Sequence, residues 1–561
     1  MKHDIDLSSI KSSQVDHLPI ISHFAGKMGF EKIINELVPT EMDVEPGKIV
    51  LGMVLDILSG RSPLYQLEII FNEMDCELLL GEDLPDGYFN DDNVGRVLKY
   101  IYEVGTQKIF SSISMAVVNA FSLPTNQVNF DTTSISLFGQ YLNSQKEGSP
   151  FEITHGYSKD KRPDLKQFIL SLLCVGGNIP IFGKMDSGNA SDKTINNDLL
   201  SDISKHMNNV GVEDDAFIYV ADSAVVTENN LKLMTGSHQF ITRLPATYNE
   251  CERVIIEAVE TDQWQDIGYM AQAQPTASRP NASYRVFNSY VTLYEQVYRA
   301  VVIHSSAHDK RRHKRLEREV TRSLKSIKGL AKLAEKKSFA CKEDAEMMAE
   351  KERLNSTDFH RMDITVTEKH RYASGRPKKG EPRLPVETRY VFIINIVEDE
   401  AALEKRRKVA GCFVLLTNIT NEDGTEYTAE KVLQIYKEQN GIEKNFGFLK
   451  DDRIVNAMFL KLPEHIEALG MILIIALMLW RLMERTMRNN LENNNTTLPG
   501  WNDRPTSRPT AYMLTWKFKG ALIMSLMAQR QVSGGLNETR LDFLVALNMT
   551  AENFINPTGS G

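Results

Sequence analysis

The chain has 561 residues, 42% hydrophobic and 25% charged, which is the composition of a soluble globular protein with several structural units. Its five cysteines are scattered without a CxxC pair, which argues against a zinc ribbon or a disulfide framework and is typical of a reducing cytoplasm. The formal net charge of −9 does not by itself indicate a nucleic-acid-binding protein, so the distribution of charge matters more than its sum.

Residues 1–124 are predicted to be helical. Apolar residues recur at helical spacing in "GKIVLGMVLDILSG", "PLYQLEIIFNEM" and "VGRVLKYIYEVGTQKIFSSISMAVVNAF". The polar start "MKHDIDLSSIKSSQ" contains no apolar segment of the kind that a signal peptide carries. Small helical units either present a helix to a DNA groove or serve as packing modules, so DNA binding and a structural role both stay open here.

Residues 125–247 change to the pattern of an α/β unit. Alternation in "QVNFDTTSISLFG" predicts a strand, and "KQFILSLLCVGGNIPIFGKMDSG" predicts two strands joined by a Gly-Gly-Asn turn. The run "DDAFIYVAD" is typical of a buried central strand, and "HQFITRLP" predicts another strand. Helices are predicted in "DKTINNDLLSDISKHMNNVG" and "TENNLKLMTG". This order of elements predicts a mixed central sheet.

Residues 248–388 interrupt this pattern and are interpreted as an inserted subdomain that splits the α/β unit. Its run from Lys310 to Lys337, "KRRHKRLEREVTRSLKSIKGLAKLAEKK", is strongly basic. Either a solvated helix face or a nucleic-acid-binding surface explains such a run. Residues 389–490 return to strands in "RYVFIINIVE" and "GCFVLLTNI" and then to helices, as the second half of the core. Residues 491–561 are expected to form a C-terminal helical region.

The most apolar run of the chain, "ALGMILIIALMLW", extends from Ala468 to Trp480. Charged residues flank it at Glu467 and Arg481, and it is short for a bilayer span. We therefore predict a buried helix and no association with a membrane.

The stretch "YKEQNGIEKNFGFLK" places four polar side chains at helical spacing: Tyr436, Gln439, Glu443 and Lys450. On one continuous helix of about 100° per residue, they fall within a stripe roughly 60° wide. The apolar residues of the same stretch form a neighbouring stripe, which we expect to be buried. This arrangement brings a phenol, an amide, a carboxylate and an ammonium group to the edge of the buried face.

Three carboxylates stand out because acids at strand ends and on a facing helix are costly to bury unpaired. Asp131 lies inside the first predicted strand, Asp222 closes the strand "FIYVAD", and Glu443 lies on the late helix. Each one alone has an ordinary explanation as a turn cap, an ion-pair partner or a surface acid. Together, three converging carboxylates predict a site for hard cations, with two Mg²⁺ or Mn²⁺ ions able to support phosphodiester cleavage.

Other candidate ligands are weaker. Asp160 and Asp164 share a basic loop and are interpreted as surface ion pairs, and Asp186 as the start of a turn. His155 either touches a phosphate or is an ordinary loop histidine. Trp264 either stacks on an unpaired base or belongs to the core, which is the more common role. The sequence contains no phosphate-binding P-loop, GxSxG motif or clustered His/Cys zinc set.

The stretch "YKEQNGIEKNFGFLK" resembles the Y-x2-R-x3-E-x6-K signature of cut-and-paste insertion-sequence DDE transposases, with Tyr436, Glu443 and Lys450 at matching positions. Asp131 in "NFDTTSISLFG" and Asp222 in "YVADSAVV" fall where that family has its first and second aspartates. "HGYSKDKRPDLKQ" and "SGNASDKT" also resemble segments of these enzymes. The resemblance extends from about residue 129 to residue 480. The signature arginine is replaced by Gln439, which brings no charge.

The resemblance implies a ribonuclease-H-like catalytic domain that is interrupted after its fifth strand by an insertion. It also implies that Asp131, Asp222 and Glu443 hold the catalytic ions, while Tyr436, Gln439 and Lys450 hold the DNA backbone. The expected substrate is double-stranded DNA, both the terminal repeats and the target, bound by a homodimer in the cytoplasm at the nucleoid. In the basic run, phosphate contacts are expected from Arg311, Arg312, Lys314, Arg315 and Arg318.

Two alternatives to a transposase stay open at this point. One is an inactive transposase-derived DNA-binding protein, and the other is a nuclease of the same fold that cuts DNA but does not join strands. The presence of all three carboxylates favours activity, and a strand-transfer assay distinguishes a transposase from a nuclease.

Overall fold

The computed structural model describes residues 11–60, 64–145, 148–209, 211–212, 216–271, 280–375, 382–420, 427–451, 460–526 and 529–556. The chain forms two compact units in a mixed α/β fold. Unit 1 combines Met1–Thr242 with Leu433–Gly561, and unit 2 is Arg243–Val432. The three predicted carboxylates all belong to unit 1, because the chain returns to this unit before Glu443.

The N-terminal part of unit 1 is helical, as predicted. The Asn90 carboxamide caps one helix by accepting a hydrogen bond of 2.7 Å from the Asn93 N–H. The helices are α1 (Leu18–Met28), α2 (Phe30–Leu37), α3 (Pro46–Ser59), η2 (Leu64–Gln66), α4 (Leu67–Glu73), α5 (Cys76–Leu80), α6 (Asp91–Val104) and α7 (Thr106–Ala120).

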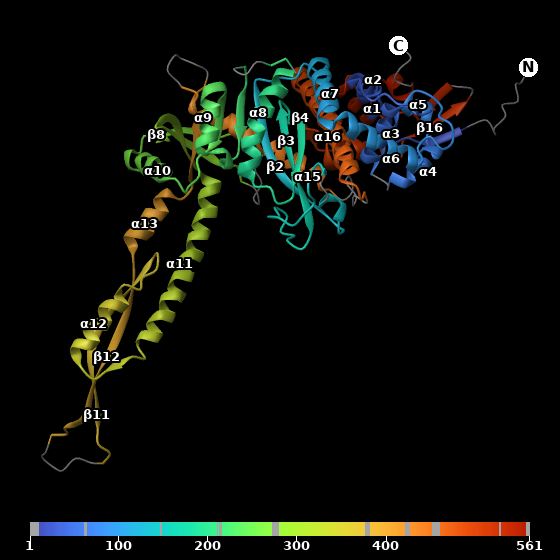
Figure 1. The fold of residues 1–561 in the computed structure, drawn as a ribbon. Helices are drawn as coiled ribbons and strands as arrows, with labels where there is room; N and C mark the ends of the chain where they lie inside the picture. Colours follow the sequence, from blue (N-terminus) through green and yellow to red (C-terminus); the bar gives the residue numbers. More distant parts are fainter. Residues whose placement is uncertain are drawn as a thin grey trace, which may run out of the picture. The chain divides into compact units, whose positions relative to one another are not determined.

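Strands of a mixed sheet lie at the centre of unit 1, in the spatial order β4-β3-β2-β5-β6. Of these strands, β2, β3 and β4 are labelled in Figure 1. The first three strands in the chain, β2, β3 and β4, pair antiparallel, whereas β5 pairs parallel with both β2 and β6. The predicted strands and helices of this region are confirmed. They are β2 (Gln127–Leu137), η3 (Leu142–Gln145), β3 (Lys166–Val175), β4 (Ile179–Ser187), α8 (Asp192–Asn209), β5 (Ile218–Ala221), η5 (Ser223–Val225), α9 (Glu228–Ser237) and β6 (Gln239–Arg243).

The β3–β4 connection is the tight turn predicted from Gly-Gly-Asn. Gly177 and Asn178 have φ values of 83° and 61°, in the left-handed region that tight hairpin connections use. Glycine reaches this backbone conformation without steric cost, and asparagine tolerates it better than most residues. The turn therefore has one well-defined shape, on which other elements can pack.

The signature stretch is not one continuous helix, so this prediction is wrong. α14 (Ala429–Glu438) ends before Gln439, and α15 (Asn440–Leu449) begins after it. The turn between them is tightened, because the Gln439 N–H donates to the Tyr436 carbonyl and the Ile442 N–H to the Gln439 carbonyl. The four polar side chains therefore do not share one uninterrupted helical face.

The apolar run belongs to α16 (Pro463–Asn494), the long central helix of unit 1. By length and composition it could cross a membrane, but 94% of its most apolar window is buried inside the protein. It packs against α3 and α6 on one side and against β4 on another. The prediction of a buried helix is confirmed.

The C-terminal part contains strands in addition to the predicted helices. β16 pairs antiparallel with β1 near the start of the chain and with β17. The Arg530 guanidinium of β17 also pairs with Asp75 and Glu77, at 2.7 and 2.6 Å, and so ties this part to the N-terminal helices. The elements are β1 (Lys11–Gln14), β14 (Leu498–Pro499), η6 (Trp501–Asp503), β15 (Pro505–Thr506), α17 (Ala511–Phe518), β16 (Leu522–Leu526), β17 (Gln529–Val532), α18 (Glu538–Ala546) and α19 (Ala551–Ile555).

Unit 2 contains four antiparallel strands in the order β13-β9-β8-β7 and a second sheet in the order β10-β12-β11, which α11 and α12 cover (Figure 1). The strands predicted in "RYVFIINIVE" and "GCFVLLTNI" are confirmed as β12 and β13, and both lie within Arg243–Val432. The elements are α10 (Asn249–Thr261), β7 (Gln265–Tyr269), β8 (Ser283–Leu293), β9 (Gln296–Ser305), α11 (Ser306–Ala334), β10 (Ser338–Phe339), α12 (Lys342–Arg353), β11 (His360–Tyr372), β12 (Pro385–Glu398), α13 (Glu400–Val409) and β13 (Cys412–Thr417).

Two buried histidines of unit 1 predict a loss of stability in acid. Burial lowers the pKa values of His17 and His206 to about 4, so both are neutral in the folded protein. Their stability contribution is complete above pH 6.5 and is lost as the pH falls toward 4, because the unfolded chain then binds more protons. At pH 5 each histidine should cost about 2 kcal/mol. Urea unfolding at pH 7 and pH 5 should show a smaller pH-dependent loss for His206→Gln than for wild type, whereas exposed His370→Gln should leave it unchanged.

Candidate active site

Asp131 and Asp222 lie close to the end of the pairing between two neighbouring parallel strands. The register of β2 and β5 ends with Asn129 opposite Val220; Asp131 lies two residues further along β2, and Asp222 directly follows Ala221, the last residue of β5. Asp222 keeps an extended backbone, with φ −69° and ψ 165°. Because side chains alternate along a strand, both aspartates share the sheet face of Asn129 and Val220. The strand pairing therefore brings the two predicted carboxylates to one place on the sheet.

Both carboxylates also accept local hydrogen bonds. The Asp131 Oδ1 accepts from the Thr132 N–H at 2.8 Å, and the Asp222 Oδ1 accepts from the Ser223 N–H at 2.5 Å. The Asp222 carbonyl accepts from the Thr242 hydroxyl of β6 at 3.0 Å. These bonds restrict the rotamers of both carboxylates.

The helices α14 and α15 lie against the same face of β2. Gln127 lies four residues before Asp131 on β2, so their side chains point to the same face of the sheet. The Gln127 carboxamide donates to the Ile435 carbonyl of α14 at 3.3 Å. The Gln439 carboxamide donates to the Phe130 carbonyl, also at 3.3 Å. Gln439, the residue that replaces the signature arginine, is therefore turned toward the strand that carries Asp131, and exposed Glu443 follows one turn later.

Lys450 and Lys159 bring positive charge to this region. The Lys159 ammonium donates to the carbonyl and the hydroxyl of Thr132, at 2.8 and 2.7 Å, immediately after Asp131. Lys450 forms an ion pair of 2.7 Å with Asp160. Asp164 pairs with Arg162 at 2.7 Å, so the interpretation of both loop acids as ion-pair partners is confirmed. The Lys159 ammonium thus lies next to the residue that follows Asp131, whereas Asp160 and Asp164 are each paired with a cation.

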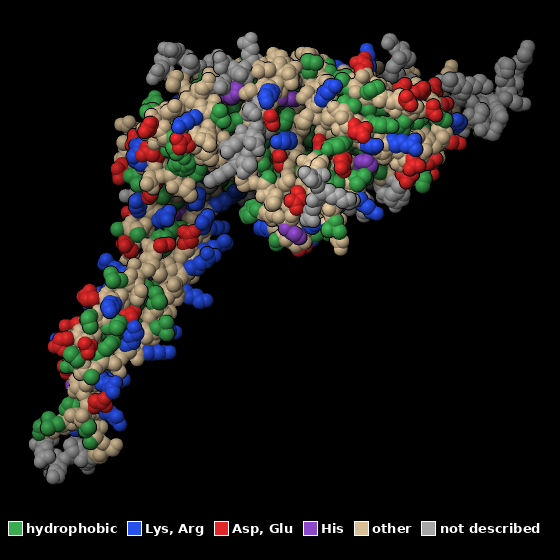
Figure 2. Space-filling view, viewed as in Figure 1, with side chains coloured by type: hydrophobic (Ala, Val, Ile, Leu, Met, Phe, Trp, Pro, Cys, Tyr) green, Lys and Arg blue, Asp and Glu red, His purple; other side chains and the backbone are tan. Residues whose placement is uncertain are grey.

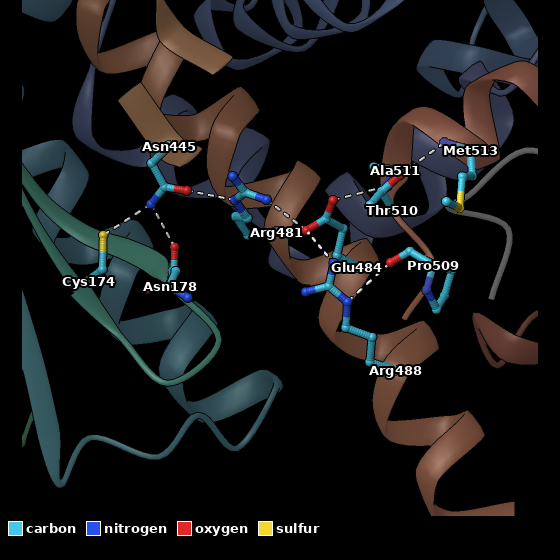
Figure 3. A network of polar contacts seen from close by, with 10 residues as sticks. All are labelled: Cys174, Asn178, Asn445, Arg481, Glu484, Arg488, Pro509, Thr510, Ala511 and Met513. Carbon is cyan, nitrogen blue, oxygen red and sulfur yellow. Dashed lines mark hydrogen bonds and ion pairs between the residues drawn. The ribbon is translucent and has the colours of Figure 1, made fainter. Parts of the chain in front are cut away.

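The turn between β3 and β4 is the docking point of α15. At Gly441 any side chain would clash, since a Cβ there would lie 2.0 Å from the Asn178 carboxamide carbon. One helical turn later, the fully buried Asn445 carboxamide donates to the Asn178 carbonyl at 2.9 Å and to the Cys174 Sγ at 3.3 Å (Figure 3). Because Asn445 and Glu443 are two residues apart, they lie on nearly opposite sides of α15. Anchoring Asn445 therefore directs Glu443 away from the core.

A buried ionic network holds Asn445 from behind. The Asn445 Oδ1 accepts a hydrogen bond of 2.6 Å from the Arg481 guanidinium of α16, and Arg481 pairs with Glu484 at 2.7 Å. Glu484 also accepts from Arg488 at 3.1 Å and from the Ala511 N–H of α17 at 3.1 Å (Figure 3). Glu484 is only 2% exposed, so its charge depends on these partners. The network connects α15, α16 and α17.

Cys174 is a structural thiol in this arrangement. It lies on β3 opposite Asn129, and burial raises its pKa to about 12 despite the nearby Asn445 hydrogen bond and the Arg481 charge. The Cys174 thiol is therefore neutral at physiological pH and unsuited to act as a nucleophile. Its contact with the Asn445 carboxamide contributes to positioning α15.

The predicted metal site is only partly assembled in the described residues. No group of three or more His, Cys, Asp and Glu side chains is placed to hold a metal ion there, and this includes the three predicted carboxylates. The pairing of β2 with β5 brings Asp131 and Asp222 together, while Glu443 remains exposed on α15. The donor set consists of carboxylate oxygens, which suits Mg²⁺ or Mn²⁺.

The basic run of unit 2 forms α11, with cations on one face and apolar residues on the other. At about 100° per residue, seven exposed cations fall within roughly 100° of the helix circumference. Lys and Arg side chains accordingly line one edge of α11 in Figure 2. Buried Leu316, Ile327 and Ala331 lie on the opposite face. The seven cations, called the basic stripe below, are Arg311, Lys314, Arg315, Arg318, Arg322, Lys325 and Lys332.

Of the remaining candidates, Trp264 is half-buried in unit 2, with the Arg285 guanidinium 5.3 Å from its ring centroid. His155 is exposed, and Asp186 lies 3.4 Å from the Lys184 ammonium within β4. Half-buried Tyr436 lies in the last turn of α14. None of these positions adds a ligand to the two aspartates.

Sequence reasoning did not identify Asn445 or Arg481. Both are polar residues inside apolar helical patterns, in "NFGFLK" and after "ALMLW", where a buried polar side chain needs a partner. A polar residue at an apolar position of the helical pattern was therefore the only indication that each side chain has a buried polar partner. The sequence could not show that Asn445 and Arg481 are partners, because the apolar pattern of one helix does not specify which residue of another helix it contacts.

Residues 10–115 match the model of a domain of unknown function (DUF4277), a domain often found in transposase-like proteins. The matched region comprises β1 and the helices from α1 through most of α7. No curated protein matches the chain. The match therefore characterises the N-terminal part of unit 1 and does not extend to the strands that carry Asp131 and Asp222.

Removing Arg481 should destabilise unit 1 strongly. Arg481→Met leaves Glu484 with one fewer cation in a buried position and Asn445 without its donor, which should cost about 3–5 kcal/mol of unfolding free energy. Arg485→Met, one turn further along α16, is the matched control. Arg485 has no carboxylate partner in the described part of the chain, so this change should cost less than about 1.5 kcal/mol. Equal losses in urea unfolding would contradict a special role for the network.

Proposed function

We propose that the protein is a DNA transposase that binds the ends of its insertion sequence, cleaves phosphodiester bonds and joins the 3′ ends to target DNA. The observation that carries the proposal is that Asp131 lies on β2 and Asp222 directly follows its parallel neighbour β5, with the Glu443 helix against the same sheet face. These are the three positions at which the sequence resembles DDE transposases. The N-terminal match to a domain often found in transposase-like proteins supports the same proposal.

The fold of the catalytic part would be ribonuclease-H-like. The resemblance implies five strands followed by an insertion, and β2 to β6 are five strands of one mixed sheet. Unit 2 begins at Arg243, the last residue of β6, and the chain returns to unit 1 at Leu433. The position of the insertion in the chain thus agrees with the expected interruption, and α15 follows it with the third carboxylate.

In this proposal, Asp131, Asp222 and Glu443 would hold two Mg²⁺ or Mn²⁺ ions. The bound ions would activate a water molecule or a 3′-hydroxyl and stabilise the leaving oxygen. The β2–β5 register fixes the backbones of both aspartates, and their hydrogen bonds to Thr132 and Ser223 orient the carboxylates. The Asn445 anchor sets the rotation of α15 about its axis and so directs Glu443 outward.

Cations of each unit would contribute to binding the DNA backbone. In unit 1, Lys450 can exchange its exposed partner Asp160 for a phosphate, since an exposed ion pair contributes little stability. Tyr436 would contribute its hydroxyl to the same backbone, whereas Gln439 would mainly hold α15 on β2.

In unit 2, the basic stripe extends over much of α11, whose 29 residues are roughly 43 Å long. Within the described residues, Arg315 is the only stripe member in an ion pair, with Glu319 at 2.7 Å. Because the stripe is a row of exposed cations along one face of the helix, it suits contacts to successive phosphates. We expect it to contribute affinity, and a homodimer on paired DNA ends would carry two such stripes.

Conservative changes in the three carboxylates should abolish cleavage. Asp131→Asn, Asp222→Asn and Glu443→Gln each remove a ligand charge with little change in shape. Cleavage of element-end DNA in Mg²⁺ should fall by roughly a hundredfold or more, since bound metal contributes several kcal/mol to the reaction. DNA binding in a gel-shift assay should persist. Mn²⁺ should replace Mg²⁺, whereas Ca²⁺ should support little chemistry.

Asp164→Asn serves as the control, because it removes an exposed carboxylate that is paired with Arg162. Its cleavage rate should stay close to that of wild type. Near-normal cleavage by any one of the three site variants would remove that residue from the proposed triad. Cleavage without strand joining would favour the nuclease alternative, and DNA binding without cleavage by wild type would favour the inactive DNA-binding protein.

The basic stripe should determine part of the salt dependence of DNA binding. Changing Arg311, Lys314 and Arg318 together to Gln should lower the log–log salt slope by up to about 2.7, since each phosphate contact contributes roughly 0.9. Affinity should fall alike for specific and unrelated duplexes. A control with the same loss of charge changes exposed Lys342, Lys351 and Arg407 to Gln and should leave the slope nearly unchanged. Equal slopes for the two triple variants would favour a solvated helix face.

A further inference from the structure

The sheet β10-β12-β11 of unit 2 is covered on one side. α11 and α12 pack on its inner face, where Met362, Ile364 and Phe392 are buried. Because side chains alternate along a strand, the register of β11 with β12 puts their odd-numbered residues on the opposite side. These residues, from Arg361 to Arg371 and from Glu387 to Val397, are all exposed or half-buried and are called the outer face below.

Away from the helices the two strands form a bare ribbon. Figure 1 shows β11 and β12 continuing past the ends of α11 and α12. From Glu368 to Tyr372 every residue of β11 is exposed, so side chains on both sides of the ribbon face solvent. A two-stranded ribbon without a covering layer is only marginally stable in water. A partner bound to this segment would supply the support that the helices give to the rest of the sheet.

Positive charge dominates the outer face of this ribbon. Lys369 lies directly opposite Arg389 in the strand register, where like charges repel each other. Glu387 lies 2.7 Å from Arg389 and 3.6 Å from Arg371, so one carboxylate serves two guanidinium groups. Lys369 has no carboxylate partner in the described part of the chain. Three cations and one carboxylate therefore meet here, and the surplus charge favours a polyanion.

The remaining acid of the ribbon faces the other way. Glu368 belongs to the inner side, where it lies 3.5 Å from the ring of His370. It therefore does not offset the cations of the outer face.

The middle of the outer face carries short polar side chains and little apolar area. Thr365 and Asn395 are exposed, and Ile393 is 53% exposed. Stable protein interfaces bury roughly 800 Å² per partner around an apolar centre, which one exposed isoleucine does not provide. Hydroxyl, amide and methyl groups are instead those that contact base edges in the major groove of DNA.

We propose that the outer face of β11 and β12 lies in the major groove of duplex DNA, with Lys369, Arg371 and Arg389 directed to the flanking phosphates. A groove about 12 Å wide admits a two-stranded ribbon, and its rims supply the anions that these cations need. The inference rests on the proposed function only in naming DNA as the polyanion. It concerns residues of unit 2 alone.

This surface is separate from the basic stripe. The stripe lies on the side of α11 that faces away from the sheet, whereas the outer face lies on the side of the sheet that faces away from α11. One straight duplex therefore cannot lie on both. The stripe contacts phosphates without entering a groove, which makes it a matched comparison on the same subdomain.

The test measures binding of the full chain by fluorescence anisotropy without divalent metal ions. The probes are a short DNA duplex, an RNA duplex of the same sequence and one of the DNA strands. Lys369→Gln combined with Arg389→Gln should weaken binding to the DNA duplex by about tenfold and lower its log–log salt slope by up to about 1.8, at roughly 0.9 for each phosphate contact. Binding to the RNA duplex, whose major groove is deep and narrow, and to the single strand should change by less than about twofold.

Two further double variants remove the same charge elsewhere. Arg322→Gln with Lys325→Gln takes two cations from the stripe and should weaken binding to DNA and RNA duplexes alike. Lys342→Gln with Lys351→Gln takes two exposed cations from α12 and should leave all three probes nearly unaffected.

Lys369→Glu separates loss of binding from loss of folding. The new carboxylate lies opposite Arg389 and replaces repulsion by attraction. The melting temperature should therefore stay the same or rise, while binding to the DNA duplex falls further than in Lys369→Gln. A lower melting temperature together with weaker binding would count against the proposal.

Unchanged DNA binding in the double variant of Lys369 and Arg389 would overturn the proposal. Equal losses on the DNA and RNA duplexes would reduce the outer face to a general cationic patch, and an equal loss on polyglutamate would indicate an acidic protein. DNA binding that depends on these residues in a protein without cleavage activity would sink only the transposase proposal. Normal cleavage with unchanged binding in the variants would sink only this one.

Discussion

The contact between α15 and the β3–β4 turn is the constraint on which the candidate site depends. Gly441 must approach Asn178 closely, and Asn445 must find its acceptor on that turn, before Glu443 can project from the opposite side of the helix. The turn has a fixed shape because Gly177 and Asn178 both have positive φ. The β3–β4 hairpin, which the sequence indicates only as an ordinary turn, is thus the surface on which α15 packs. This helix carries Glu443, the third proposed metal ligand.

Local features of the fold were predictable where one strand or helix has a clear pattern. The alternation in β2, the apolar run in β5 and the glycine turn after β3 each have a direct physical cause in the sequence. The break at Gln439 was not predictable, because the same spacing fits a continuous helix, and the hydrogen bond from Gln439 to Phe130 joins residues 309 positions apart. β12 and β13 were predictable as strands, but not which strands they pair with, since a strand pattern does not specify its partner.

For the candidate site, the sequence indicated the three acids but not the residues that position the helix carrying Glu443. Asp131 and Asp222 could be paired in advance only through the resemblance, and the β2–β5 register now gives that pairing a physical basis. Asn445, Arg481 and Glu484 were missed because their role comes from contacts between separate helices. The basic run was recognised as a helix with charge, yet which of its faces is buried depends on the strands against which α11 packs.

The two sides of α15 also differ in what they require energetically. On the inner side, Asn445 connects to Arg481 and Glu484, where a missing partner would leave a buried charge and cost several kcal/mol. On the outer side, exposed Glu443 faces little desolvation cost and can move toward a cation when one is present. In the proposed site, a rigid inner face combined with a solvated outer carboxylate would allow α15 to tolerate repulsion among Asp131, Asp222 and Glu443. The stability of the network would therefore maintain an acidic site that, without metal, gains no stability of its own.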